Sequence, residues 1–385
     1  MDAKLFDYAK YLLSVTVLLI SAYGFWLGGN FAWLGAGILL AILYFDSFLE
    51  NDYSMRDQRH VWLYDAIICT TIIAAFGHVF WYAYLVGAEH FTTWSASIGA
   101  FVSTALVGFV VAAPPLHEMF HRETTFQRTL GRIGNALIFD PWREITHVVT
   151  HHLYVCTPDD PDYARRGQNV YSHVVGTLYR QVKDAYHLEK SIWHKRERPW
   201  WHPANGWVWR ASILLTVTVA LLIVGGVQGA LLAIATCLIG PRSFLEVFNY
   251  FNHYGLVTAT PAHFEPRHTW NHLTPFVRVL ALEITNHAGH HADSYVPFYE
   301  LVPDRDGPKQ PQFLVCVLLA LVPPLWYAVI KRRLAHWDAH YATDEEREIA
   351  WRENERAGWH DLNEAMLADS QRSMDAPRTT LPIAA

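Results

Sequence analysis

The stretch WSASIGAFVSTALVGFVVAAPPLHEMFH, residues 94–121, joins an apolar run to two histidines. The run 94–114 contains no charged residue, and about 20 apolar residues are enough to cross a bilayer. His117 and His121 follow a few residues after the run ends, with HxxxH spacing. The stretch therefore predicts a membrane helix that delivers two imidazoles to one face of the membrane.

The composition of the whole chain fits a membrane protein. Of its 385 residues, 52% belong to the hydrophobic set and 17% are charged, whereas soluble globular proteins carry about 25% charged residues. The net charge of −6 is modest, and no basic domain indicates nucleic-acid binding. The four cysteines are scattered without a CxxC pair, so the pattern indicates neither a disulfide framework nor a thiolate metal site.

Long apolar segments predict the membrane topology. They pair into three hairpins whose turns contain neither Lys nor Arg, and the opposite ends carry nearly all the positive charge. The positive-inside rule then places both termini and the large loops in the cytoplasm. A seventh apolar run, 313–330, is interrupted by Pro323 and Pro324, so we expect a buried or interfacial helix there. The six predicted spanning segments are 9–28, 31–47, 63–87, 94–114, 207–225 and 228–250.

The predicted fold is all-α, a polytopic membrane protein with six transmembrane helices and a cytoplasmic helical metal-binding cap. The first segment lacks a small-residue cleavage site and is expected to remain as a membrane helix. The polar tail is expected to be helical to about residue 368 and disordered beyond it. The expected parts are 1–116 with helices 1–4, 117–206 with the first histidine clusters, 207–250 with helices 5 and 6, 251–330 with the remaining clusters, and the charged tail 331–385.

Nine of the 22 histidines fall into four clusters, two of them just after predicted membrane helices and two in predicted cytoplasmic loops, so that all four can converge on the cytoplasmic membrane face. Their spacings are HxxxH, HxxxHH and HxxHH, and a single histidine lies in NYFNHYG. One zinc ion needs three or four protein ligands, whereas nine imidazoles suit two metals of higher coordination with positions left for oxygen. The predicted ligands are His117, His121, His147, His151, His152, His253, His287, His290 and His291.

Two other readings use the same residues. HEMFH matches the HExxH motif of zinc proteases, in which the glutamate, here Glu118, is the general base. A metalloprotease would leave both HH clusters unexplained. A metal transporter or metal-binding membrane protein is the second alternative, but transport ligands should lie near the bilayer midplane and these lie beyond the helix ends.

The order of the clusters resembles the membrane histidine-box di-iron enzymes, which include fatty-acid desaturases and alkane hydroxylases. NYFNHYG is similar to the NYxEHYG-type motif of the alkane-hydroxylase branch, with Asn252 where that branch has Glu. Longer stretches, among them REITHVVTHHLYVCTPDDPD and EITNHAGHHADSYVPFYELVP, resemble the hydroxylase subunits of xylene (toluene side-chain) and p-cymene monooxygenases. The similarity extends over most of the chain.

The resemblance implies a monooxygenase of the bacterial inner membrane that holds two non-haem irons. It implies that one atom of O2 enters a C–H bond and the other forms water. The expected substrate is a methyl-substituted aromatic such as toluene, xylene or p-cymene, oxidised to the benzylic alcohol. A medium-chain alkane hydroxylase and a fatty-acid desaturase stay open as alternatives.

Electrons must come from a partner, because the chain has no flavin fingerprint and no CxxC cluster for an iron–sulfur or rubredoxin centre. By resemblance this partner is a soluble NADH-dependent reductase with FAD and a [2Fe–2S] centre, with a rubredoxin as the less favoured donor.

Neutral imidazoles leave two irons strongly cationic, so we expect polar residues to orient the ligand N–H groups. Glu246 precedes His253 by two helical turns, and Glu283 precedes His287 by one. Asn249 and its neighbour Asn252 offer amide oxygens to the second N–H of His253. Roles near the ligands or the pocket are expected, by resemblance, for the HTWNH stretch. The predicted supporting residues are Glu118, Glu144, Asp160, Glu246, Asn252, His268, Trp270, Asn271, His272, Glu283 and Asp293, with Asp140, Asp159 and Asp162 as further candidates.

Overall fold

The computed structural model describes residues 7–375, and within that range the chain is helical. An isolated bridge between Asn271 and Lys309 is the only β-type pairing among the described residues. The all-α prediction is confirmed. The α-helices are α2 (Leu12–Leu27), α3 (Leu34–Asp46), α4 (Trp62–Gly87), α5 (Trp94–Val107), α6 (Ala113–Phe120), α7 (Thr125–Leu137), α8 (Arg143–Ile145), α9 (His152–Tyr154), α10 (Val170–Lys195), α11 (Gly206–Cys237), α12 (Ser243–His253), α13 (Pro275–Leu280), α14 (His287–Ala292), α15 (Phe313–Ala320), α16 (Pro323–His340), α17 (Asp344–Ala357) and α18 (His360–Asp375). The short 3-10 and π elements are η1 (Gly29–Trp33), η2 (Gly108–Ala112), η3 (Thr146–His151), η4 (Leu238–Arg242), η5 (Pro266–His268) and η6 (Phe298–Glu300).

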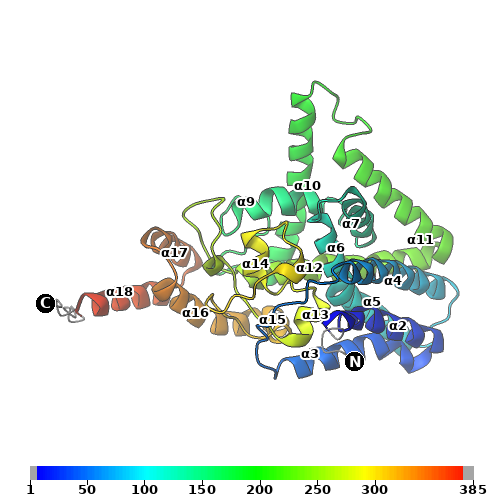
Figure 1. Cartoon of the computed structure of the whole chain (residues 1–385), viewed down its shortest axis with the longest axis horizontal. Coiled ribbons are helices and arrows are strands. Elements are labelled where there is room, and N and C mark those ends of the chain that lie inside the picture. The colour runs from blue at the N-terminus through cyan, green and yellow to red at the C-terminus, as the bar shows by residue number, and fades with distance from the viewer. Residues whose placement is uncertain (1–6, 376–385) are drawn as a thin grey trace.

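Apolar helices gather at one end of the molecule (Figure 1). Four helical runs are long and apolar enough to cross a membrane, namely Gly29–Asp46, Trp62–Gly87, Trp94–Phe120 and Gly206–His253, and α2 is a shorter apolar helix. Together with α2 they cover all six predicted apolar segments. The histidine-bearing elements α6, α9, α12 and α14 lie in the middle of the view, and α16–α18 extend to the opposite end.

The candidate membrane span Gly206–His253 bends at one glycine. The run has 48 residues, and at 1.5 Å per residue it would measure roughly 72 Å if straight. Gly226 interrupts it with φ 61° and ψ −170°, a conformation that only glycine adopts readily. Two helical halves therefore replace one overlong helix.

Glycines also let α11 approach α4 closely. A Cβ added to Gly229 would lie 2.2 Å from the carbonyl oxygen of Ala83, and a Cβ on Gly225 would lie 2.6 Å from the same oxygen. Small residues at such contacts allow two helix backbones to pack tightly inside a bilayer, where no hydrophobic effect drives helices together.

Three π-helical turns interrupt the helices that lead to the histidines. Pro114 and Pro115 follow η2 and Pro241 lies within η4, and proline both lacks the N–H donor and clashes with the carbonyl four residues earlier. The two turns pack together, since a Cβ on Gly108 would lie 3.1 Å from the Pro241 ring. The third turn, η3, itself carries histidines, and π turns occur frequently at functional sites.

The apolar run 313–330 is two helices rather than one. α15 ends at Ala320 and α16 restarts at Pro323, because prolines in the first turn of a helix need no hydrogen bond from their nitrogen. Neither helix is among the candidate membrane spans of the described chain, in agreement with the expectation of a buried or interfacial segment. The tail is helical to Asp375, beyond the predicted limit, and the predicted disordered end 376–385 lies outside the described residues.

The close contact between α4 and α11 gives a stability prediction. Gly229→Ala forces a methyl group against the Ala83 carbonyl, and overpacking of this kind costs about 1–3 kcal/mol. The thermal unfolding midpoint of the detergent-solubilised protein should fall. Gly77→Ala in α4 is the matched control, because nothing lies within 4 Å of its added Cβ and alanine is the better helix former by about 1 kcal/mol. Equal midpoints for the two variants would contradict this account.

Candidate metal centre

Five short elements bring the nine predicted ligand histidines to one place. α6 supplies His117 and ends at His121, η3 supplies His147 and His151, and α9 begins at His152. α12 ends at His253, and α14 carries His287, His290 and His291. Seven of the nine are buried, while His117 and His152 are partly exposed. The structure thus collects residues from positions 117 to 291 into one cluster.

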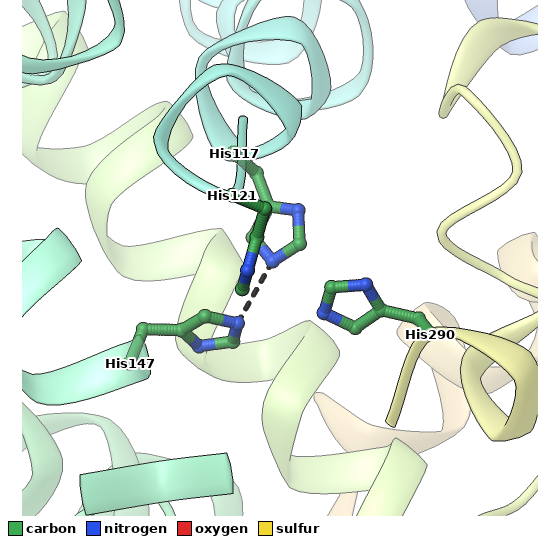
Figure 2. Close-up of side chains that lie close together, drawn as sticks. All are labelled: His117, His121, His147 and His290. Atoms are coloured by element: carbon green, nitrogen blue, oxygen red, sulfur yellow. Dashed lines mark hydrogen bonds between the residues drawn. The ribbon is translucent and has the colours of Figure 1, made fainter. Parts of the chain in front are cut away.

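The first group of four converges on a common point, as Figure 2 shows. The Nε2 atoms of His117 and His147 lie 2.8 Å apart. Both ring nitrogens of His121 and Nε2 of His290 are buried and have no hydrogen-bond partner in the described structure. The candidate ligand atoms all lie within 4.8 Å of one another, and the group consists of His117, His121, His147 and His290.

The second group is held by hydrogen bonds that fix the ring protons of two of its histidines. His253 donates from Nδ1 to the His268 carbonyl at 3.0 Å, and His287 donates from Nδ1 to the Ile284 carbonyl at 3.2 Å. With both protons so assigned, the two Nε2 lone pairs face each other at 2.9 Å. Two lone pairs repel at that distance unless a cation lies between them. The group consists of His151, His253, His287 and His291.

His152 lies between the two groups. Its Nε2 is 3.2 Å from Nε2 of His147, and its ring centroid is 4.9 Å from that of His290. On the other side its ring stacks on His291 with centroids 4.5 Å apart. The nearest nitrogen contact is with the first group, so His152 is placed to complete that group as a fifth ligand.

Burial favours the neutral form of most of the imidazoles outside the candidate membrane spans. It lowers the pKa of His287 to about 3, and burial together with the neighbouring rings holds the pKa values of His121, His147, His290 and His291 well below their ordinary range. Neutral imidazole is the form that binds metals. Buried ring nitrogens without partners cost about 1–3 kcal/mol each, a cost that metal ligation removes, so this donor set fits two cations.

His151 has its own carboxylate. Asp160 Oδ2 lies 2.9 Å from His151 Nδ1, and burial lowers the pKa of His151 while Asp160 and Asp162 outweigh it and raise that pKa. A carboxylate on Nδ1 leaves Nε2 as the metal ligand and makes the ring a stronger donor. Asp160 is the predicted supporting carboxylate that the structure places against a candidate ligand.

Buried arginines surround the other carboxylates of this region. Arg143 pairs with Asp140 and with Glu246, and Arg242 also binds Glu246. Asn249 donates to Asp162 at 3.1 Å and to Glu246 at 3.0 Å. Asp162 Oδ2 lies 3.9 Å from His151 Nδ1, and burial, followed by the nearby charge of Glu246, raises the pKa of Asp162. The network fixes η3 against α12.

The predicted partners of His253 were wrong. Asn249 binds Asp162 and Glu246, and the Asn252 side chain accepts a hydrogen bond from Gln310 at 3.0 Å. The His268 carbonyl takes the proton instead. Every residue has a backbone carbonyl, so the sequence could not show which one accepts the hydrogen bond from His253.

Several predicted carboxylates serve the scaffold rather than the histidines. Glu118 binds Arg122 and accepts from the Phe298 backbone, and Glu144 binds Arg132 and Arg210. Glu283 binds Arg56, Arg278 and Tyr11, and Asp293 is exposed and caps the Tyr295 backbone. Helical spacing suggested that they lie near the clusters, but arginines hold Glu118, Glu144 and Glu283.

All four singled-out residues of HTWNH are buried. His268 binds Glu346 at 2.7 Å, and Trp270 donates to the Tyr254 carbonyl. Asn271 accepts from the Ala288 backbone at 3.3 Å and so supports α14. His272 contacts Gln310 at 3.0 Å. Trp270 and Asn271 thus contact the segments that carry His253 and His287, whereas His268 and His272 bind side chains of other segments.

Sequence reasoning missed Arg143, Arg242, Cys156 and Glu346. The Cys156 thiol donates to the His268 carbonyl at 3.1 Å and lies 3.9 Å from His253 Nδ1. Arg143 stands four residues before His147, a spacing that could have been noticed. Glu346 is 78 residues from His268, and no local pattern marks it.

A largely apolar cavity adjoins both groups. His117 and His147 of the first group and His287 of the second form part of its wall. Phenylalanines and aliphatic residues make up most of the rest, together with Asn135, Arg143 and Asn249. The remaining lining residues are Phe109, Val110, Ala113, Pro114, Phe120, Leu245, Phe248, Val277, Ala281, Ile284 and Phe313.

Comparison with known proteins agrees with this site. A family model described as fatty acid desaturase matches residues 92–307. The chain is 36% identical to the xylene/toluene monooxygenase hydroxylase component of Pseudomonas putida, over 92% of this chain and 96% of that protein. This chain is a membrane monooxygenase of the fatty acid desaturase family. It is also 27% identical to alkane 1-monooxygenase 1 of Pseudomonas aeruginosa, over 73% of this chain and 74% of that protein, and 23% identical to the alkane 1-monooxygenase of Ectopseudomonas oleovorans, over 86% and 87%.

The protease reading does not fit this membrane monooxygenase. Glu118 would have to face a metal-bound water to act as general base. Its carboxylate instead lies 2.9 Å from Arg122 Nε and accepts from the Phe298 backbone at 3.2 Å. It holds the loop after α14 in place.

The Asp160 contact gives a prediction for metal binding. Asp160→Ala removes the acceptor from His151 Nδ1, and loss of such a partner lowers metal affinity roughly 10–100-fold. Chelator competition on the purified protein measures the change. Asp159→Ala is the matched control, because the Asp159 carboxylate is exposed, and the metal affinity of this variant should stay within about twofold of the parent's. Equal affinities of the two variants would refute the assigned role.

Proposed function

We propose that this membrane monooxygenase is a di-iron hydroxylase that converts the methyl group of a hydrophobic aromatic, such as toluene, xylene or p-cymene, to the benzylic alcohol. The observation that carries the proposal is the apolar cavity whose wall includes histidines from both groups. A relative with 36% identity is named for xylene and toluene, and relatives with 23–27% identity are named for alkanes.

In this proposal the nine histidines hold two irons. His117, His121, His147, His152 and His290 would bind one, and His151, His253, His287 and His291 the other. When bound, the irons use two electrons and two protons with O2 to insert one oxygen atom into a C–H bond and release the other as water. Imidazole alone does not select iron over zinc or copper. The proposal of iron rests on the number of ligands and on the family.

The protein's own residues position the substrate and keep it dry. Phe109, Phe248 and Phe313 form one aromatic side of the cavity, with the Phe109 and Phe313 rings stacked at 5.7 Å. An apolar wall of this kind binds a hydrocarbon through burial of its surface and excludes water from the reacting methyl group. His117, His147 and His287 mark where that methyl group must point.

The proposed topology has six membrane crossings. α2, the Gly29–Asp46 run, α4 and the Trp94–Phe120 run give four, and the two halves of the Gly206–His253 run, divided at Gly226, give two more. The asymmetry of Lys and Arg places the termini and the metal centre on the cytoplasmic side of a bacterial inner membrane. A lipid-soluble substrate would then enter from the bilayer, and a soluble donor would reach the centre from the cytoplasm.

The electron donor in this proposal is a soluble NADH-dependent reductase with FAD and a [2Fe–2S] centre, with a rubredoxin as the alternative. The four cysteines of the described chain are free and widely separated in sequence, so they supply no iron–sulfur or rubredoxin site of their own.

Product analysis tests the substrate. Membranes that contain the protein and a matching reductase should oxidise p-xylene and p-cymene to benzylic alcohols faster than they oxidise octane, because a benzylic C–H bond is weaker. Each substrate is supplied alone and in competition, and products are identified by mass spectrometry. Faster terminal hydroxylation of octane would instead indicate an alkane hydroxylase, and an alkene product would indicate a desaturase.

A substitution at His253 tests the size of the ligand set. His253→Ala should lower iron content from about two towards about one per chain, because it removes one of the four histidines of the second group and the Nε2 that lies 2.9 Å from Nε2 of His287. Hydroxylation should disappear while the protein still inserts. His263→Ala, an exposed control, should keep both. Two irons and near-normal turnover in His253→Ala would reduce the ligand set to eight.

A further inference from the structure

The second histidine group is supported by the C-terminal segment, which the sequence suggested to be no more than a charged tail. α17 lies at the end of the molecule opposite the apolar helices (Figure 1). Its Glu346 is nevertheless only 2% exposed and reaches the loop that holds His253. The connection consists of three residues, Glu346, His268 and His253.

The contacts along this connection have a fixed direction. His268 Nδ1 accepts a hydrogen bond from the Glu265 backbone at 3.0 Å, so its proton is on Nε2. That Nε2 donates to Glu346 at 2.7 Å. The imidazole is thus held at both nitrogens, and the η5 turn that contains it cannot rotate freely.

The fixed turn aims a carbonyl at the candidate ligand. The His268 carbonyl accepts from His253 Nδ1 at 3.0 Å and from the Cys156 thiol at 3.1 Å. All three side chains are buried. Because the carbonyl fixes the proton on Nδ1, it decides that His253 presents Nε2 to His287.

Glu346 is itself fixed by several independent contacts. Its backbone and side chain form a capping box with Thr343 at the start of α17, and Arg267 donates to its carboxylate. A second buried pair joins the same regions, since Arg166 binds Asp338 of α16 at 2.6 Å and donates to the Gly255 carbonyl at 2.8 Å. The segment after His253 is therefore attached to α16 through Arg166 and to α17 through His268.

We propose that Glu346 is a positioning residue for the second metal ligand group, acting through His268 on His253. The inference rests on the proposed di-iron function. The inference gives the C-terminal segment after residue 331 a role in metal binding. The Glu346 carboxylate touches no candidate ligand, yet the metal affinity of the second group depends on it.

Iron content and iron spectroscopy test the proposal without relying on turnover. Glu346→Ala leaves the buried His268 N–H without an acceptor, and we expect iron affinity of the second group to fall about tenfold, at the lower end of the 10–100-fold effect of partners that touch a ligand directly. After dialysis against a chelator the variant should retain about one iron where the parent retains about two. Its Mössbauer spectrum should lose one of two iron environments.

Matched variants separate positioning from general damage. Glu353→Ala removes another buried carboxylate of α17, one that binds Arg165 and Arg356, and should keep both irons. Glu346→Gln retains an acceptor for His268 and should restore most of the iron. The losses in Glu346→Ala, His268→Ala and the double variant should be non-additive, because the two residues act in one chain of contacts.

The outcomes are distinct. If Glu346→Ala does not accumulate as folded protein, Glu346→Asp withdraws the carboxylate by one methylene and should show the same selective loss. Two irons with an unchanged spectrum in the folded Glu346 variants, or equal losses in Glu353→Ala, would overturn the positioning role. A parent protein without iron would instead overturn the proposed function.

Discussion

Two imidazole lone pairs that face each other at 2.9 Å are the feature on which the rest of the site depends. His253 and His287 each give their proton to a backbone carbonyl, so neither can donate to the other. Burial lowers the pKa of His287, and all four histidines of its group are buried. A bound cation is the arrangement that turns this repulsion into attraction, and the surrounding loops are built to hold the rings for it.

The helices are interrupted where they must deliver these rings. Prolines accompany the π-helical turns η2 and η4. These turns directly precede α6, which is followed by His121, and α12, which ends at His253. Unpaired backbone groups are costly inside a bilayer, so a π-helical turn is tolerated there where other protein segments pack against it. η2 and η4 pack against each other, with Gly108 facing the Pro241 ring. η3 carries both His147 of the first group and His151 of the second, and their rings stack with centroids 4.9 Å apart.

The helices and the nine clustered histidines could be predicted from the sequence, because the patterns that mark them lie within short stretches of the chain. Apolar runs and histidine spacings mark the helices and the nine rings. The partners of those rings are not local. Asp160, nine residues after His151, was among the predicted supporting residues and lies 2.9 Å from His151 Nδ1. For Glu246 and Glu283, helical spacing could not reveal that Arg143 and Arg56 bind them. The His268 carbonyl and Glu346 depend on loop geometry and on a contact across 78 residues.

The two groups are supported in different ways, and this bears on how the centre forms. In the second group Nδ1 of His151, His253 and His287 is held by Asp160 or by a backbone carbonyl, so those rings are oriented before metal arrives. In the first group Nδ1 of His121 and of His147 has no partner among the described residues. Preorganised ligands lose less conformational freedom on binding, so the second group should bind its metal more tightly for a given ligand number. Both kinds of ring reach the apolar cavity, since His147, whose Nδ1 has no partner among the described residues, and His287, whose Nδ1 is held by the Ile284 carbonyl, both line it.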